Sequence, residues 1–268
     1  MKKNIMKIAI VLGVLIGSVA LTGCGSDNTE TKSDTEYVKA KGAIVVGITE
    51  FEPMDYKDGS GNWVGFDAEM AKAFADSLGV EVDFVEIDWD SKEMELENAS
   101  IDCVWNGMTL NAAVKKAMKT SNPYCKNAQV VVVNKDVADK YSDKESCKEL
   151  NFAVEAGSAG ADAAKEQGYK YVEVQTQAAA LMEVQAGTAD AAIIDLLMAG
   201  AMIGDGTSYD KLTYTVSLTS EEYGVGFRKD SDLPSKLNEF LLKSYEDGTM
   251  MEIAKKYGTQ ESLIEQTA

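Results

Sequence analysis

Two apolar runs of this sequence each end in side chains that can form hydrogen bonds with a small molecule. Residues 191–194 (AAII) lead into Asp195, and residues 101–105 (IDCVW) lead into Asn106, Gly107, Met108 and Thr109. A carboxylate can balance an ammonium group through charge-assisted hydrogen bonds, and amide and hydroxyl groups can satisfy further polar atoms. The competing interpretation of Asp195 is a carboxylate that caps the helix after it.

Three other positions have the chemistry of a binding site. Phe51 and Trp89 could enclose an apolar or cationic side chain, because aromatic faces attract cations, although each could be an ordinary half-buried aromatic. Glu50 comes just after an expected strand, where the alternative is a solvated charge at the rim. Packing roles are expected for Trp105, Met182, Val184, Leu196, Leu197 and Met198.

The composition argues against several kinds of catalysis. The chain contains no histidine, so no histidine base can activate Ser158 as a nucleophile. The loop at 157–160 (GSAG) lacks the Lys-Ser/Thr ending and the longer glycine spacing of a phosphate-binding loop. The cysteines of the folded part are too widely spaced for a structural zinc site, and they allow one disulfide or none: Cys103, Cys125 and Cys147. We therefore expect neither a metal nor a cofactor.

The polar residues 106–109 follow a strand in a part of the chain where strands and helices are expected to alternate. Asp67 is expected to cap the first helix, which continues with apolar residues at four-residue spacing until Gly79 ends it. Ser91 can cap the second helix. The strands are expected at 43–48, 80–87 and 101–108.

The second half of the chain repeats this plan. Its strands are expected at 151–156, 169–175 and 191–194, and Thr176 is expected to cap the later helix. Alternation of this kind predicts an α/β fold with mostly parallel sheets covered on both faces. Ligands of open α/β sheets bind beyond the carboxyl ends of the strands, so two such lobes facing each other would form a cleft at these polar residues.

The N-terminus has the features of a secretory signal. Residues 1–23 contain a basic start, the apolar stretch 8–21 and a small-residue cleavage site before Cys24, which resembles a bacterial lipoprotein signal. A transmembrane helix would need about 20 apolar residues. The polar residues after Cys24, up to 37, predict a flexible tether.

The charge of the chain restricts its partners. The full chain has a formal net charge of -18, and loss of the three lysines in residues 1–23 takes it to -21. Nucleic acid and anionic membrane surfaces are therefore unfavourable partners.

Several stretches together resemble the amino-acid-binding family of extracellular solute-binding proteins of ABC transporters. The resemblance covers residues 38–262 and rests on many degenerate motifs in the right order: "FEPMDYKDGSGNWVGFDAEMAKAFADSLG", "IDCVWNGMTL", "SNPYCKNAQVVVV", "AVEAGSAG", "GTADAAIIDLLMA", "EEYGVGFRKDSDL" and "DGTMMEIAKKYG". It implies a periplasmic-binding-protein-like fold, in which two α/β lobes hinge shut around a ligand. Only the closed, liganded protein would then present both lobes to a membrane permease.

The resemblance also implies boundaries and a location. Lobe 1 would comprise residues 38–128 and 224–268, and lobe 2 residues 129–223. The two crossovers between the lobes would lie near 124–129 and 222–227. The protein would be a monomer, secreted and anchored through lipid on Cys24 to the outer face of the bacterial cytoplasmic membrane.

Carried over residue by residue, the resemblance places Asn106 to Thr109 at the backbone groups of the ligand. It places Ser158 and Ala159, at the start of a helix, near a ligand carboxylate, and Asp195 against an ammonium. A helix N-terminus suits an anion because its amides are unpaired and its dipole is positive there.

One position departs from the family pattern. Family members usually have an arginine five positions after Thr109 that clamps the ligand carboxylate, and this chain has Val114. The only arginine is Arg228, in the second crossover, and Lys115 or Lys116 could supply only a point charge. Either backbone amides hold the carboxylate, or the ligand has none at that place.

We therefore expect a binding protein, without catalysis, that delivers a small zwitterionic or cationic amino acid to an ABC permease. The alternatives are an amine that lacks the carboxylate, a dehydratase of cyclohexadienyl acids on the same scaffold, and a sensor that signals through a membrane partner. The dehydratase is disfavoured because its dicarboxylate substrates need several cations in the cleft.

Overall fold

The computed structural model describes residues 33–267. The predicted signal peptide and Cys24 lie outside the described residues. Helix α1 (Asp34–Lys41) begins within the predicted tether, and the side chain of Ser33 caps it. Thr35 is buried, and its amide donates to Asp232 Oδ1 at 3.0 Å. The tether predicted up to residue 37 is therefore too long, because the first turn of α1 packs on the folded body.

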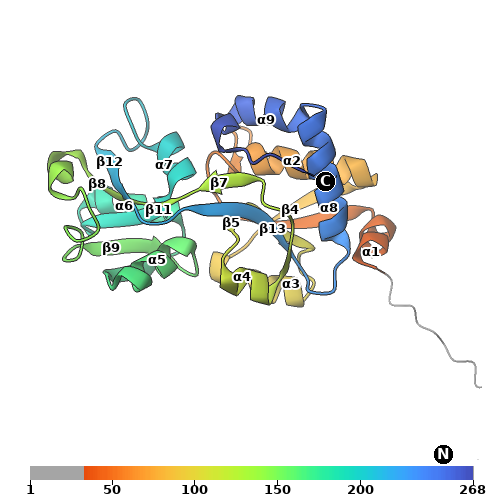
Figure 1. Ribbon diagram of the computed structural model, residues 1–268, viewed down its shortest axis with the longest axis horizontal. Coiled ribbons are helices and arrows are strands. Elements are labelled where there is room, and N and C mark those ends of the chain that lie inside the picture. The colour runs from red at the N-terminus through yellow and green to blue at the C-terminus, as the bar shows by residue number, and fades with distance from the viewer. Residues whose placement is uncertain (1–32, 268) are drawn as a thin grey trace, which may run out of the picture. The chain divides into compact units, whose positions relative to one another are not determined.

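The first sheet combines strands from both ends of the chain: β1 (Ala43–Ile48), β4 (Glu81–Glu86), β5 (Cys103–Thr109), β6 (Lys119–Thr120), β7 (Cys125–Asn127) and β13 (Glu221–Phe227). Its order is β4-β1-β5-β13-β6. Strand β7 also pairs with β13, and the two lie side by side in Figure 1. Strand β1 runs parallel to β4 and β5, whereas β13 runs antiparallel to β5, β6 and β7.

The second sheet is formed by the middle of the chain: β8 (Gln129–Asn134), β9 (Asn151–Glu155), β10 (Lys170–Val174), β11 (Ala191–Asp195) and β12 (Leu212–Ser217). Its order is β10-β9-β11-β8-β12, with β9 parallel to β10 and β11, and β8 antiparallel to β11 and β12. Both sheets are thus mixed: the predicted parallel strands are present, and antiparallel strands extend them. A short hairpin pairs β2 (Tyr56–Lys57) with β3 (Trp63–Val64).

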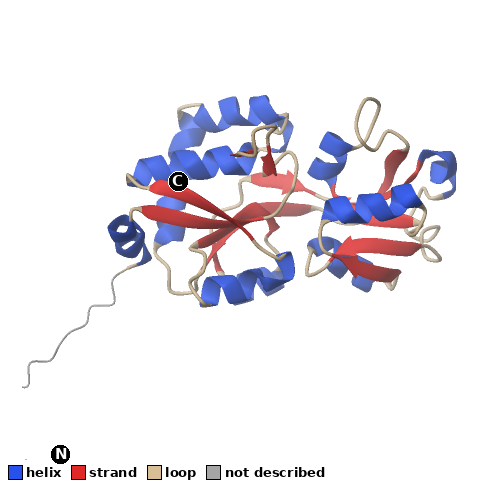
Figure 2. Cartoon of the chain, turned by 180° about the vertical axis from the view of Figure 1, so that it is seen from behind, coloured by secondary structure: helices blue, strands red, loops and turns tan. Residues whose placement is uncertain are grey.

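Helices lie on both faces of the sheets, as Figure 2 shows. The first sheet carries α2 (Phe66–Leu78), α3 (Lys92–Glu97), α4 (Ala112–Ala117), α8 (Leu233–Glu246) and α9 (Thr249–Tyr257). The second sheet carries α5 (Ala159–Gln167), α6 (Gln177–Ala186) and α7 (Leu196–Met202). Short 3₁₀ turns are η1 (Trp89–Ser91), η2 (Lys135–Lys140) and η3 (Gln260–Ser262). This arrangement confirms the predicted two-lobed α/β fold.

The chain passes between the two sheets at two places. Strand β7 leads through Ala128 directly into β8, and residues 218–220 join β12 to β13. The two passages lie side by side, because Asn127 pairs with Glu221 in the antiparallel register of β7 and β13. The lobe boundaries predicted from the sequence stay a prediction.

Two of the four predicted helix ends are confirmed, and the side-chain caps predicted at Asp67 and Ser91 are absent. The side chain of Thr176 accepts a hydrogen bond from the amide of Ala179, and Gly79 ends α2 in the left-handed conformation. Asp67 does not cap α2, since the N-cap is Gly65 and Asp67 is fully buried. Ser91 precedes α3 but makes no side-chain capping bond.

The buried residues agree with most of the predicted packing. Trp105 is 1% exposed and Met198 is 1% exposed, but Met182 is wrongly assigned to the core because it is 54% exposed on α6. The three cysteines of the described residues are buried and free. Among residues 33–267, no helix is long and apolar enough to cross a membrane.

Candidate functional site

A cavity of about 90 Å³ lies where the strand ends of the two sheets face each other. One water molecule needs roughly 15 Å³ of such space, so the cavity can hold a small molecule. Every predicted site residue except Glu50 lines it, namely Phe51, Trp89, Asn106, Gly107, Met108, Thr109, Ser158, Ala159 and Asp195. The structure places Glu50 outside the wall, with its carboxylate 4.0 Å from Lys57 Nζ.

Asn106 ties two strand ends of the first sheet together. Its Oδ1 accepts hydrogen bonds from the amide and the hydroxyl of Thr49, at 2.9 and 2.6 Å. Its Nδ2 donates to the Thr49 carbonyl at 3.1 Å and to Asp55 Oδ2 at 2.7 Å. Because these bonds use the whole amide, Asn106 positions the end of β1 instead of offering a free group to the cavity.

Gly107 allows an aromatic ring to pack against the backbone of β5. Its φ is 54°, and a Cβ at this position would lie 2.4 Å from Phe51 Cε1. Its amide donates to the buried carboxylate of Asp67 at 2.6 Å, which also accepts a bond from Tyr124 Oη at 2.7 Å. Asp67 therefore fixes β5 from the core side while the Phe51 ring contacts it from the cavity side.

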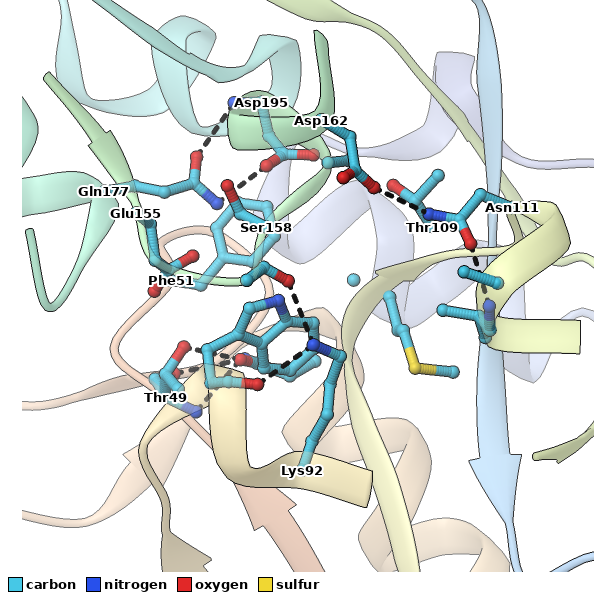
Figure 3. Close-up of a pocket in the computed structure, with 18 of the residues that line it drawn as sticks. Thr49, Phe51, Lys92, Thr109, Asn111, Glu155, Ser158, Asp162, Gln177 and Asp195 are labelled. Carbon is cyan, nitrogen blue, oxygen red and sulfur yellow. Dashed lines mark hydrogen bonds between the residues drawn. The ribbon is translucent and has the colours of Figure 1, made fainter. Parts of the chain in front are cut away.

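The carboxylate of Asp195 accepts four hydrogen bonds in the cavity wall. Its Oδ1 accepts hydrogen bonds from Tyr223 Oη at 2.6 Å, from Gln129 Nε2 at 3.0 Å and from Asn127 Nδ2. Its Oδ2 accepts from Gln177 Nε2 at 2.6 Å (Figure 3). Asp195 occupies the N-cap position of α7 but makes no side-chain capping bond, so the capping interpretation fails.

The same donors connect Asp195 to the passages between the lobes. Glu221 Oε1 accepts hydrogen bonds from Asn127 and Gln129, both at 2.7 Å, and from Thr109 Oγ1 at 2.9 Å. Asn127 and Gln129 thus lie between two carboxylates. A change of charge at Asp195 therefore acts directly on the residues where the chain crosses from one sheet to the other.

Burial sets the protonation of Asp195. Burial, reinforced by the negative charge of Glu221, raises the pKa of Asp195 to about 7, although hydrogen bonds from Tyr223, Gln177 and Gln129 lower it. A cation in the cavity would favour the ionised form.

Glu155 is a second buried carboxylate that the sequence reading missed. It ends β9, next to β11, and is only 3% exposed while lining the cavity. Burial and the charge of Asp195 raise the pKa of Glu155 to about 8, and the charge of Lys92 opposes this shift. The rule that predicted Asp195, a polar residue at the end of a buried strand, also applies to Glu155.

Among the described residues that line the cavity, Lys92 is the one with a positively charged side chain. Its Nζ donates to the carbonyls of Trp89 and Gly157, each at 3.0 Å, and lies 4.7 Å from the centre of the Trp89 ring (Figure 3). Val114 lines the same cavity, whereas Arg228 instead bonds Asp34, Asp102 and the Ile101 carbonyl. Lys115 and Lys116 are exposed and do not line the cavity.

The start of α5 closes the cavity from the second lobe. The Ser158 hydroxyl accepts a hydrogen bond from the amide of Ala161 at 3.1 Å and therefore caps the helix. Polar contacts also link the two lobes, with Gln175 Nε2 donating to Asp88 at 2.7 Å and Asn111 Nδ2 to Asp162 at 3.4 Å. The lobes are thus held against each other around the cavity.

The arrangement suits binding of a charged small molecule. Carboxylates and an ammonium face the cavity, and the nearby hydroxyl of Ser158 accepts the helix-capping hydrogen bond from the Ala161 amide. Opposite charges in a buried space are strong recognition elements because little water screens them.

The sequence is similar to those of known binding proteins. Residues 44–260 match the family model of bacterial extracellular solute-binding proteins, family 3. The arginine-binding extracellular protein ArtP of Bacillus subtilis is 32% identical over 254 residues, covering 90% of this chain and 94% of ArtP.

Two solved structures share the fold. The P235GK mutant of ArgBP from T. maritima has a TM-score of 0.78 and 32% identity, covering 84% of this chain and 98% of that chain. The ancestral amino acid-binding protein AncCDT-1, described as a precursor of cyclohexadienyl dehydratase, has a TM-score of 0.77 and 32% identity, with coverages of 84% and 99%. The family match spans most of the chain, and the protein belongs to the bacterial extracellular solute-binding proteins of family 3.

Proposed function

We propose that this protein captures a small zwitterionic or cationic amino acid and delivers it to an ABC permease. The observation that carries the proposal is the set of opposite charges around one buried cavity, with Asp195 and Glu155 from the second lobe and Lys92 from the first. The two buried carboxylates and the one buried ammonium complement a ligand with two cationic groups and one anionic group. ArtP and ArgBP, whose names refer to arginine, support a ligand of this kind.

Capture would proceed by closure of the lobes around the ligand. Asp195 would receive the ammonium, the rings of Phe51 and Trp89 would contact the ligand side chain, and Ala159 would face its carboxylate. The network from Asp195 through Asn127 and Gln129 supports a link between ligand charge and the passages at which the lobes hinge. The closed form would then be the one that the permease recognises.

The family and the N-terminal sequence support a proposal for the location. An extracellular solute-binding protein is secreted, and we propose that lipid on Cys24 retains it at the outer face of the cytoplasmic membrane as a monomer. A shift of the protein to the soluble fraction on Cys24→Ser would support the anchor.

A dehydratase on this scaffold has less support. A dicarboxylate substrate needs cations, and Lys92 faces four acidic residues in the cavity wall of the described chain: Glu93, Glu155, Asp162 and Asp195. An absorbance assay for prephenate turnover tests this alternative, and measurable turnover would overturn the proposal of a binding protein without catalysis.

Thermal unfolding with a ligand panel tests the proposed function. The protein is produced from residue 24 with Cys24→Ser, and is heated with the common amino acids, their decarboxylated amines and small dicarboxylates. A ligand that binds only the folded state stabilises it by RT ln(1 + [L]/Kd), about 4 kcal/mol at a thousandfold excess over Kd. We expect a cationic amino acid to give the largest rise in melting temperature. A response to dicarboxylates alone would contradict the proposal.

A further inference from the structure

Lys92 is a buried ammonium group without a carboxylate partner. The residue is 7% exposed, at the start of α3. Among the described residues, none of the ion pairs with a nitrogen-to-oxygen distance up to 4.0 Å includes it. Burying a charge without a partner is costly, so such a group needs a source of negative charge nearby.

The ammonium has one hydrogen-bond donor left for a ligand. Of its three N–H groups, one donates to the Trp89 carbonyl and one to the Gly157 carbonyl. Lys92 lines the cavity together with Ala113 and Val114, whose side chains carry no charge. Within the described part of the wall, Lys92 is therefore the group whose positive charge can pair with a ligand anion. Val114 offers no such charge.

The nearby carboxylates do not replace such an anion. Glu93, Glu155 and Asp162 line the same cavity and raise the pKa of Lys92 through their charges, yet burial outweighs them and the pKa is lowered. A net lowering indicates that the protein itself does not fully compensate the buried charge. An anionic ligand group beside Nζ would complete the compensation.

Lys92 also spans the two lobes. Its bond to the Gly157 carbonyl reaches from α3 of the first lobe to the loop before α5 of the second. The lobes approach so closely there that a Cβ on Gly157 would lie 2.8 Å from Asp90 Cα. An anion bound at Lys92 would thus act at a point that is complete only when the lobes are closed.

We propose that Lys92 is the specificity-determining residue that binds the anionic group of the ligand. It would replace the arginine that family members have at the position of Val114. This inference rests on the proposed function and decides between its two ligand classes. The ligand retains a carboxylate, and an amine without one is bound more weakly. The carboxylate is bound by a point charge with one free donor, in contrast to the two-pronged grip of a guanidinium.

Affinities for matched ligand pairs test this inference. We would measure Kd by calorimetry for L-arginine and agmatine, L-lysine and cadaverine, and L-histidine and histamine. The proteins are wild type, Lys92→Met, Lys92→Arg and the control Lys115→Met, which removes an exposed lysine outside the cavity. Melting of each protein without ligand shows that it is folded.

We expect wild type to prefer an amino acid over its amine by at least about tenfold. Lys92→Met should bring that ratio close to one by weakening the amino acid alone, Lys92→Arg should restore part of the ratio, and Lys115→Met should leave it unchanged. An equal loss for both members of a pair would assign Lys92 to lobe closure only and overturn the inference. Wild type that prefers the amine would also overturn it while leaving ligand capture intact, and wild type that binds no panel member would contradict the proposed function itself.

Discussion

Two buried carboxylates lie at neighbouring strand ends in the wall of the cavity. Asp195 and Glu155 are both buried, and their pKa values are raised to about 7 and about 8. Both groups are therefore partly protonated near neutral pH when no ligand is bound. Besides burial, Glu221 raises the pKa of Asp195, and hydrogen bonds from Tyr223, Gln177 and Gln129 lower it. The charge of Asp195 raises the pKa of Glu155, and Lys92 and Gln177 lower it.

This protonation predicts a pH dependence of binding. We expect the affinity for a cationic amino acid to rise from about pH 6 to about pH 8, since the carboxylates must ionise to pair with the ligand. Asp195→Asn should weaken binding by about ten- to hundredfold and flatten the pH profile, whereas Asp139→Asn, which changes an exposed residue of η2, should do neither. Calorimetric titration across this pH range measures both effects, and undiminished binding by Asp195→Asn would contradict the assignment.

The stability of the unliganded protein should have the opposite trend. The folded-state pKa values of Asp195 and Glu155 lie above those of the unfolded chain, as does that of Asp67, which burial raises to about 7. The folded state binds more protons than the unfolded state between about pH 4 and pH 8, so these groups favour folding at low pH and lose that contribution as the pH rises. Chemical denaturation without ligand checks the direction.

At the scale of elements, the ends of β1 and β5 form a unit that positions Phe51. Asn106 joins these strand ends through Thr49, and Gly107 leaves room for the Phe51 ring. The sequence assigned Asn106 and Gly107 to direct ligand contact. In the structure the Asn106 side chain bonds Thr49 and Asp55, and the Gly107 amide donates to Asp67. The shape of this wall therefore depends on Asn106 and Gly107.

A glycine pair isolates the effect of that packing. Gly107→Ala would place a Cβ against the Phe51 ring, whereas Gly168→Ala, at a similar positive φ, would meet nothing within 4 Å. Both changes share the strain of a positive φ, and the first adds overpacking that costs roughly 1–3 kcal/mol. We expect Gly107→Ala to lower the melting temperature and the ligand affinity more than Gly168→Ala. Equal effects of the two changes would show that Phe51 moves aside without loss.

At the scale of the whole molecule, the cavity exists only because two lobes meet. Its wall combines Lys92 and Trp89 from the first lobe with Glu155, Ser158 and Asp195 from the second. Figure 1 shows β13 passing beside β7 between the two sheets, and the Glu221 network lies at this passage. In the proposed function, ligand charge and lobe closure would therefore act on the same residues.

The close approach of the lobes predicts a variant that cannot close fully. Gly157→Ala would bring a Cβ to 2.8 Å from the Asp90 backbone, while Gly187→Ala, also at a positive φ, has no atom within 4 Å. We expect Gly157→Ala to lower ligand affinity by about tenfold or more, the equivalent of 1.4 kcal/mol per factor of ten, with the Gly187→Ala control close to wild type. Small-angle X-ray scattering with saturating ligand should show a larger radius of gyration for Gly157→Ala. If ligand reduced the radius of gyration of Gly157→Ala as much as that of wild type, the loop that contains Gly157 would have moved to accommodate the Cβ.

The sequence by itself determined the three parallel strands of each lobe with the helices between them, the polar residues at the strand ends and the presence of Val114 where family members have an arginine. These follow from local periodicity and from residue identity, which need no knowledge of distant contacts. Only the tertiary structure decided that Asp67 is buried in the core instead of capping α2. It also decided that the Asn106 side chain bonds Thr49 within the protein, and that Lys92 and Glu155 reach the cavity. The reason is physical: burial and pairing join residues far apart in the chain, and these long-range contacts determine which polar groups remain available to a ligand.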